Sequence, residues 1–295
     1  MSLQPFNIDI AIMTNIKIIG NNNGTVLDFN NKFNGLFTFR IIQNKGETII
    51  IENIVYINLL EENKPRYGNN HGSIFRTEVN CDKSLRTNST SIVFNDCNFY
   101  DNTVKLVHLY HINYKEVENY ECSAITFKNC NFINNRGLFY SYNSQFYFDN
   151  CYISKVEKYS EPVSVSETHD SSFYAQNGRD YVNIKNSIFE NINIKKVYPL
   201  IEGVELKLDI KNTTFRNCHT NYDYLIHIKS CNNIMAINVK NSTFTDTSNI
   251  FNGNFCRYNI SDSIFKNITI KNSIPVISDS AYSHFTISNT EFKDL

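Results

Sequence analysis

Short apolar runs along this chain are separated at regular intervals by asparagine or aspartate. A unit of about ten residues recurs in which two apolar residues alternate with variable ones and are followed by Asn, a small residue and, two positions later, Phe. The clearest copy, ITFKNCNFIN, spans 125–134, and other copies begin at Ile92, Phe146, Val182, Leu208, Ile237, Tyr258 and Phe285. Self-similarity with a period of roughly 20 to 40 residues is typical of solenoids.

Each repeat predicts three short strands: one before the first Asn, one through the Phe, and one at a further apolar run. Period-two alternation within such short runs favours strands over helices. The sequence therefore predicts an all-β fold, a single-stranded right-handed parallel β-helix of about ten coils. We expect one domain over 1–295, with degenerate coils over 1–91, regular coils over 92–295 and surface excursions at 113–122 and 155–180. The expected third strands lie at 106–109, 138–140, 163–165, 200–201, 225–228, 250–251 and 275–277.

Stacking of equivalent positions gives each position in the unit a physical role. Apolar residues such as Ile125, Phe127 and Phe132 should point inward and form apolar columns. The two polar positions, represented by Asn129 and Asn134, should form corners, because Asn and Asp tolerate left-handed backbone. Their amides can pair from coil to coil. We expect these ladder residues to face inward.

Composition excludes some classes of protein. The net charge of −1 gives nucleic-acid binding no electrostatic support, and no apolar run is long enough to span a bilayer. The segment 1–20 carries Asp9 and Lys17 within its apolar stretch and lacks a basic start. It is therefore not a secretory signal as written, and instead indicates a repeat already under way.

The repeat resembles the right-handed β-helix proteins of the pectin-lyase-like superfamily, and within it the polymorphic outer-membrane and adhesin-like repeat proteins, whose units carry Phe, Asn and a small residue. The resemblance covers about 16–295. It implies a secreted or cell-surface protein, a glycoprotein in which the β-helix is a non-catalytic structural, adhesin-like or surface-recognition rod. The same superfamily contains polysaccharide-active enzymes, which is the alternative function.

The enzyme alternative finds little support in the residues. Polygalacturonase-like sites carry Asn-Thr-Asp, Asp-Asp and Gly-His-Gly strings, and this chain has none of them. Asp149 and Asp209 should lie two coils apart on one outer face, about 9.6 Å by stacking, at the edge of the range of inverting glycosidases. Lys185 between them should keep both ionised. We predict no catalytic residue and no cofactor.

The same face is a candidate site for an anionic glycan. Its outward position before the first corner holds Lys185, Lys211 and Lys240 in consecutive coils, with Asp209 nearby. A polysaccharide or cell-surface glycan lying along the rod would relieve their repulsion. The alternative is an ordinary solvated face on which Lys discourages aggregation. We favour this second interpretation and expect no retention on anionic polysaccharide at physiological salt.

The 8 cysteines and 7 histidines do not form a metal pattern. Cys97, Cys130 and Cys151 occupy the small-residue position that other coils fill with Ser or Thr, so we expect free thiols there. The remaining cysteines, Cys81, Cys122, Cys218, Cys231 and Cys256, lie elsewhere in the repeat without Cys-x-x-Cys or Cys/His spacing.

Six Asn-x-Ser/Thr sequons occur in the chain. Three are ladder positions that we expect to face inward: Asn212, Asn241 and Asn267. The candidate N-glycosylation sites are therefore Asn23, Asn88 and Asn259.

The last coil ends at Leu295, directly after Phe292 and Asp294 have entered their columns. Solenoids need polar caps, because an uncovered coil presents unpaired backbone edges. We expect this chain to be part of a longer one, and residues 1–295 alone to associate end to end.

Overall fold

The computed structural model describes most of the repeat region and several loops. The described residues are 6–22, 24–32, 35–42, 45–59, 73–81, 89–103, 105–112, 122–135, 138–142, 145–156, 173–176, 180–195, 199–229, 235–270, 274–277 and 282–295. Within them the chain forms strands only, and so no helix that could cross a membrane is found there.

The strands form three sheets, and as far as β27 each sheet takes every third strand of the chain. Sheet A contains β1 (Phe6–Ile12), β4 (Gly35–Ile41), β7 (Ser73–Asn80), β10 (Lys105–Ile112), β13 (Phe139–Tyr142), β16 (Phe173–Gln176), β19 (Ile201–Val204), β22 (Ile226–Lys229) and β25 (Phe251–Gly253). Sheet B contains β2 (Ile16–Ile19), β5 (Thr48–Glu52), β8 (Thr90–Asn95), β11 (Ser123–Lys128), β14 (Gln145–Asp149), β17 (Tyr181–Lys185), β20 (Lys207–Lys211), β23 (Met235–Lys240), β26 (Cys256–Ser261) and β28 (His284–Ser288). Sheet C contains β3 (Thr25–Lys32), β6 (Ile54–Leu59), β9 (Asn98–Tyr100), β12 (Asn131–Ile133), β15 (Tyr152–Ser154), β18 (Ile188–Ile194), β21 (Thr214–Thr220), β24 (Thr243–Ser248), β27 (Ile264–Thr269) and β29 (Glu291–Lys293).

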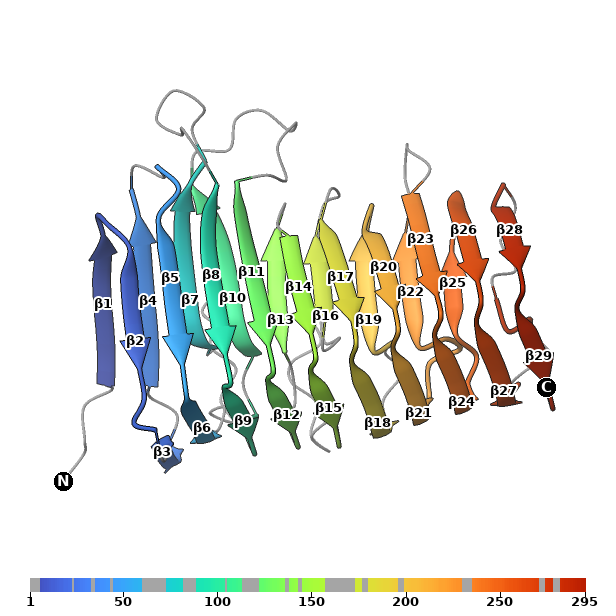
Figure 1. Cartoon of the computed structure of the whole chain (residues 1–295), viewed down its shortest axis with the longest axis horizontal. Helices are drawn as coiled ribbons and strands as arrows, with labels where there is room; N and C mark the ends of the chain where they lie inside the picture. Colours follow the sequence, from blue (N-terminus) through green and yellow to red (C-terminus); the bar gives the residue numbers. More distant parts are fainter. Residues whose placement is uncertain are drawn as a thin grey trace.

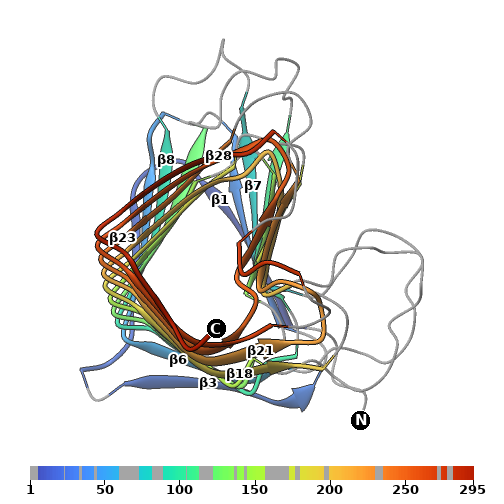
Figure 2. The ribbon, with the colours of Figure 1, turned by 90° about the vertical axis from the view of Figure 1, so that its right-hand side faces the viewer.

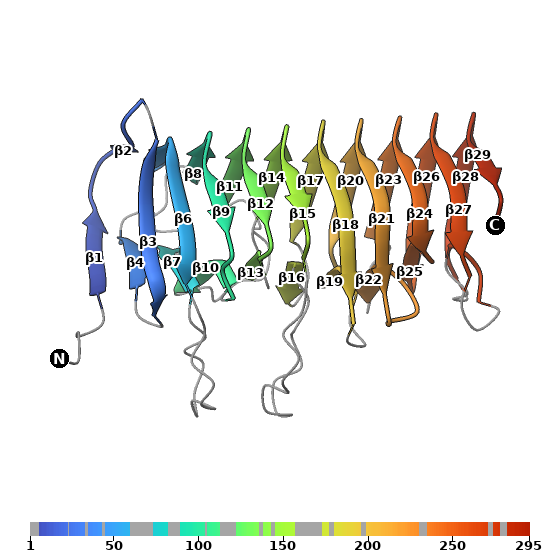
Figure 3. The ribbon, with the colours of Figure 1, turned by 90° about the horizontal axis from the view of Figure 1, so that it is seen from below.

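The chain winds as a right-handed parallel β-helix, which confirms the predicted fold. Strands of successive coils pair in parallel in all three sheets, for example Ile125 with Phe146 in sheet B and Phe132 with Ile153 in sheet C. Figure 1 shows the strands stacked along a rod, and Figure 3 shows sheet C along its length. Figure 2 looks along the rod, where three walls enclose the interior.

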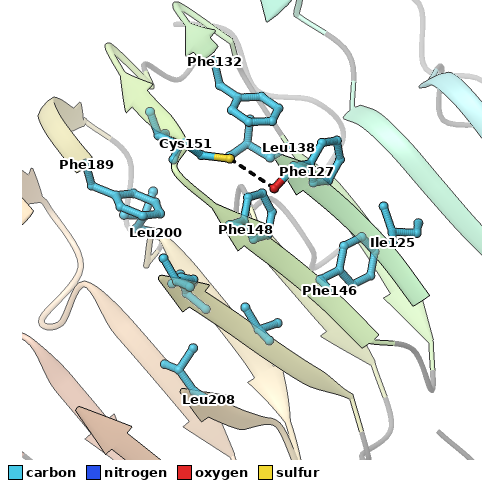
Figure 4. Close-up of a cluster of buried hydrophobic side chains, with 14 of the residues drawn as sticks. Ile125, Phe127, Phe132, Leu138, Phe146, Phe148, Cys151, Phe189, Leu200 and Leu208 are labelled. Carbon is cyan, nitrogen blue, oxygen red and sulfur yellow. Dashed lines mark hydrogen bonds between the residues drawn. The ribbon is translucent and has the colours of Figure 1, made fainter. Parts of the chain in front are cut away.

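The interior is filled by columns of side chains that occupy equivalent positions in successive repeat units, as the repeat predicts. The Phe of each unit stacks on the next: the ring centroids of Phe99 and Phe132 lie 5.1 Å apart, and those of Phe215 and Phe244 lie 4.8 Å apart. Ile153 takes this place in one coil. Figure 4 shows part of this interior, where residues of sheets B and C meet. Such stacks remove large apolar areas from water, which is the main stabilising contribution.

Both Asn columns form corners with left-handed backbone, at φ 54° for Asn129 and 57° for Asn134. The predicted ladders are present: Asn150 Nδ2 donates to Asn129 Oδ1 at 2.9 Å, and Asn217 Nδ2 donates to Asn191 Oδ1 at 2.9 Å. Their expected inward orientation is wrong, because these side chains are exposed. The residue after each corner points inward instead, for example Cys130 after Asn129 and Asn135 after Asn134, so the amides pair along the rod surface.

One predicted third strand also differs from the structure. We expected it at 163–165, which lies outside the described residues, and an excursion over 155–180. The chain instead places β16 in sheet A, where Phe173 pairs with Phe139 and Ile201. Several apolar runs compete within this long insertion, and the repeat does not say which one continues the sheet.

Candidate functional site

The outer face of sheet B carries three columns of outward side chains. The corner column precedes the first Asn corner and runs Glu52, Asn95, Lys128, Asp149, Lys185, Lys211, Lys240, Ser261 and Ser288. The middle column runs Ile50, Val93, Thr126, Tyr147, Asn183, Asp209, Asn238, Asn259 and Thr286. The entry column, near sheet A, runs Ser91, Ala124, Gln145, Tyr181, Lys207, Ala236, Arg257 and His284.

The three candidate lysines are neighbours in the corner column. Lys185 pairs in register with Lys211, and Lys211 with Lys240, and all three are exposed. Lys185 Nζ lies 3.1 Å from Asp149 Oδ2. Lys211 and Lys240 form no ion pair within the described residues. The stripe therefore ends in two adjacent unpaired cations.

Asp209 lies in the middle column at the centre of a hydrogen-bond network. The hydroxyl of Tyr181 donates to Asp209 Oδ2 and Asn238 Nδ2 donates to Asp209 Oδ1, both at 2.5 Å. Asn183 Nδ2 donates to the Tyr181 hydroxyl at 2.7 Å. Burial raises the pKa of Tyr181 to about 12, and its hydrogen bond to Asp209 adds to this. Both carboxylate oxygens of Asp209 are thus engaged by side chains of the same face.

Asp149 is held in a different way. Asn186 Nδ2 donates to Asp149 Oδ1 at 2.9 Å, and Lys185 contacts the other oxygen. Burial by itself raises the pKa of the Asp149 carboxyl, but the hydrogen bonds from Asn186 and Lys185 outweigh this, and the net pKa lies below its ordinary value. Asp149 is therefore held ionised.

The two carboxylates are also farther apart than stacking alone predicts. Asp149 shares its column with Lys185 and Lys211, whereas Asp209 shares its column with Asn183. Asp149 and Asp209 lie two coils apart along the rod, and their positions within the strand also differ by two residues. The expected alignment of Asp149 above Asp209 is wrong, because their positions in the repeat differ by two.

Two further cations on this face were missed by sequence reasoning. Lys207 and Arg257 lie exposed in the entry column. The Lys207 ammonium lies 4.8 Å from the centroid of the Tyr181 ring. Both residues directly precede the repeat unit, so a comparison limited to the unit omits them. If the alternation of inward and outward residues is continued one residue toward the N-terminus of each unit, Lys207 and Arg257 take outward positions.

Each cysteine in the described part of the chain is either a buried free thiol or part of a disulfide. Cys97, Cys130 and Cys151 are buried free thiols, as predicted. In later coils the same position carries buried hydroxyls, and Thr213 N donates to Ser242 Oγ at 3.2 Å. Cys81 and Cys122, by contrast, form a disulfide between neighbouring coils, with a Cα–Cα distance of 5.7 Å. Their positions outside the repeat unit gave no sequence signal for pairing.

Residues that could ligate a metal do not gather in the described part of the chain, where no cluster of three or more His, Cys, Asp or Glu side chains of suitable geometry occurs.

Only one candidate glycosylation site lies among the described residues. Asn259 is half-buried in the middle column and donates to Asn238 Oδ1 at 2.7 Å. Asn23 and Asn88 lie outside the described residues. The three sequons that we expected to face inward are exposed, and this correction follows from the outward orientation of the ladders. They are Asn212, Asn241 and Asn267.

Comparison with known proteins adds little about function. No family model and no curated protein matches the chain. Among solved structures, the Streptococcus pneumoniae surface protein and adhesin PfbA is similar over 95% of this chain and 89% of its own, at 9% identity and a TM-score of 0.31. The A-module of the Azotobacter vinelandii mannuronan C-5 epimerase AlgE6 is similar over 98% and 91%, at 7% identity and a TM-score of 0.18. Similarity at these scores carries no functional information.

Proposed function

We propose that this chain is a non-catalytic β-helix rod that presents a recognition surface as part of a secreted or cell-surface protein. The single observation that carries this proposal is the engagement of the two candidate acids. Asp209 accepts hydrogen bonds on both oxygens, and Asp149 is held ionised by Lys185 and Asn186. A glycosidase needs one protonated carboxyl to act as the general acid. Neither carboxyl fits that role.

The disulfide supports an extracellular setting. Disulfides persist in secreted proteins and in oxidising compartments, and they are rare in the reducing cytosol. Cys81 and Cys122 join two neighbouring coils through residues that are far apart in sequence. This pairing agrees with maturation in an oxidising compartment.

The test is to incubate the protein with a panel of neutral, carboxylated and sulfated polysaccharides and to follow polymer length by size-exclusion chromatography and residue composition by NMR. We expect neither to change over long incubation. Shortening, unsaturation or epimerisation of any polymer, lost in Asp209→Asn or Asp149→Asn, would instead establish an enzyme acting on this face.

A further inference from the structure

We infer that the outer face of β20, β23 and β26 binds an acidic polysaccharide, carboxylated or sulfated, through a basic patch formed by Lys207, Lys211, Lys240 and Arg257. This inference rests on the proposed function, because it names the ligand class of the recognition surface. All four side chains are exposed and surround Asn238 and Ala236.

Charge is distributed unevenly along this face. In earlier coils the cations have acids beside them: Lys17 Nζ lies 2.8 Å from Glu52, Lys185 lies 3.1 Å from Asp149, and Lys128 neighbours Asp149 in register. The outward positions of β20, β23 and β26 hold four cations and a single carboxylate, although the whole chain carries −1. Like charges on neighbouring strands destabilise a sheet. A bound polyanion would remove that repulsion.

The single carboxylate offsets only one of the four positive charges of the patch. Both oxygens of Asp209 accept hydrogen bonds from Tyr181 and Asn238 in its own and the neighbouring columns. Within the described residues Lys211, Lys240 and Arg257 form no ion pair, and Lys207 lies against the Tyr181 ring. The patch therefore presents its positive charge to solvent.

The dimensions suit a chain rather than a single small anion. Lys207 and Lys211 lie four residues apart on β20, about 13 Å along an extended strand, and β20 and β26 lie two rungs apart, about 10 Å. Ala236 opposes Arg257 in the entry column and leaves room between the cations. Amides of Asn238 and Asn259 lie in the middle column, where sugar hydroxyls could bind.

The same features argue against a nucleic acid as the partner. Single-stranded nucleic acids are held by stacking of bases on exposed aromatic rings. On this face the Tyr181 ring is already contacted by Lys207 and by Tyr147, whose ring centroid lies 5.7 Å away. The disulfide also agrees with an extracellular setting.

The test compares affinities for polygalacturonate oligomers, heparin, neutral dextran and single-stranded DNA, measured by calorimetry at physiological and raised salt. We expect both acidic polysaccharides to bind, dextran not to bind, and affinity to fall with salt. Replacing all four patch residues by Ser should weaken binding by about tenfold or more. Replacing Lys207, Lys211 and Lys240 by Arg should retain binding, because the charge is kept.

A matched control removes the same number of cations elsewhere and should change affinity by less than about twofold. If the patch variant and the control variant lose affinity for the acidic polysaccharides equally, the patch is not the binding site. Acidic polysaccharide binding no tighter than dextran binding, or weaker than DNA binding, would overturn the ligand class. Cleavage of a polysaccharide by the wild-type protein is a separate readout. It would contradict the proposed non-catalytic function and leave the binding patch untouched. The control cations, each replaced by Ser, are Lys17, Lys128, Lys266 and Lys293.

Discussion

Single residues in this rod have sharply different roles depending on whether they face inward or outward. Phe132 is 1% exposed and its ring contacts those of Phe99, Phe127 and Phe148. Lys211 is an exposed member of the corner column. The alternation of the sequence predicts both orientations correctly.

The effect of removing each side chain should therefore differ. We expect Phe132→Ala to lower the free energy of unfolding by about 3–5 kcal/mol, because it leaves a cavity in the aromatic column. Lys211→Ala should change it by less than about 0.5 kcal/mol. Chemical denaturation measures both, and equal effects would contradict the assigned orientations.

Acid should act on this face through Asp149, whose folded pKa is lowered. A lowered pKa contributes stability above the unfolded value, and that contribution is lost as pH falls through the folded value. We expect Asp149→Asn to lose less stability than the wild type between about pH 6 and about pH 3. Denaturant midpoints at both pH values test this. An identical loss in the variant would mean that Asp149 is not stabilised as an anion.

At the scale of the element, the repeat unit predicts the strands and corners but not everything attached to them. Stacked positions recur in every coil, so an ambiguous strand or corner in one coil can be assigned from the same positions in the neighbouring coils. Insertions occur once and have no such check, which is why β16 (Phe173–Gln176) and the Cys81–Cys122 pair were missed. The outward direction of the Asn ladders was also missed, because a two-residue corner can place either residue inward.

The corners combine two effects that one pair of variants separates. Asn212 has φ 50°, and its amide donates to Asn186 and accepts from Asn241. Asn212→Ala loses the ladder bonds and also puts Ala into left-handed backbone that Asn tolerates better, at a cost of up to roughly 1–2 kcal/mol. Asn212→Gly loses the ladder but tolerates the backbone. We expect Ala to be the more destabilising in urea, because both variants lose the ladder and only Ala strains the backbone. Equal losses would show that the ladder dominates.

At the scale of the whole molecule, the three sheets convert a one-dimensional repeat into surfaces that the sequence shows only in part. The lysine stripe is visible in the repeat, whereas Lys207 and Arg257 join it only when the full strand register is known. The basic patch is thus a property of several coils together. This explains why the stripe alone did not predict retention on acidic polysaccharide.

The disulfide ties neighbouring coils on the side of the rod where sheets A and B meet. It closes a sequence separation of 41 residues. Replacing both Cys81 and Cys122 by Ser should lower stability by about 2–4 kcal/mol, mainly by releasing the unfolded chain. Guanidinium denaturation measures the difference. A wild type whose midpoint does not respond to reductant would contradict a stabilising cross-link.

All the side-chain columns depend on one parallel register, so the central measurement is the spacing of coils along the corner column. Spin labels on Lys128→Cys and Lys240→Cys, with Cys231 replaced by Ser, should lie about 19 Å apart, four rungs along sheet B. The pair Lys128→Cys and Ser288→Cys should lie about 29 Å apart, six rungs along. Pulsed electron paramagnetic resonance showing this increase of about 10 Å would support the register. Equal distances, or a shorter one to residue 288, would contradict the β-helix and every surface built on it.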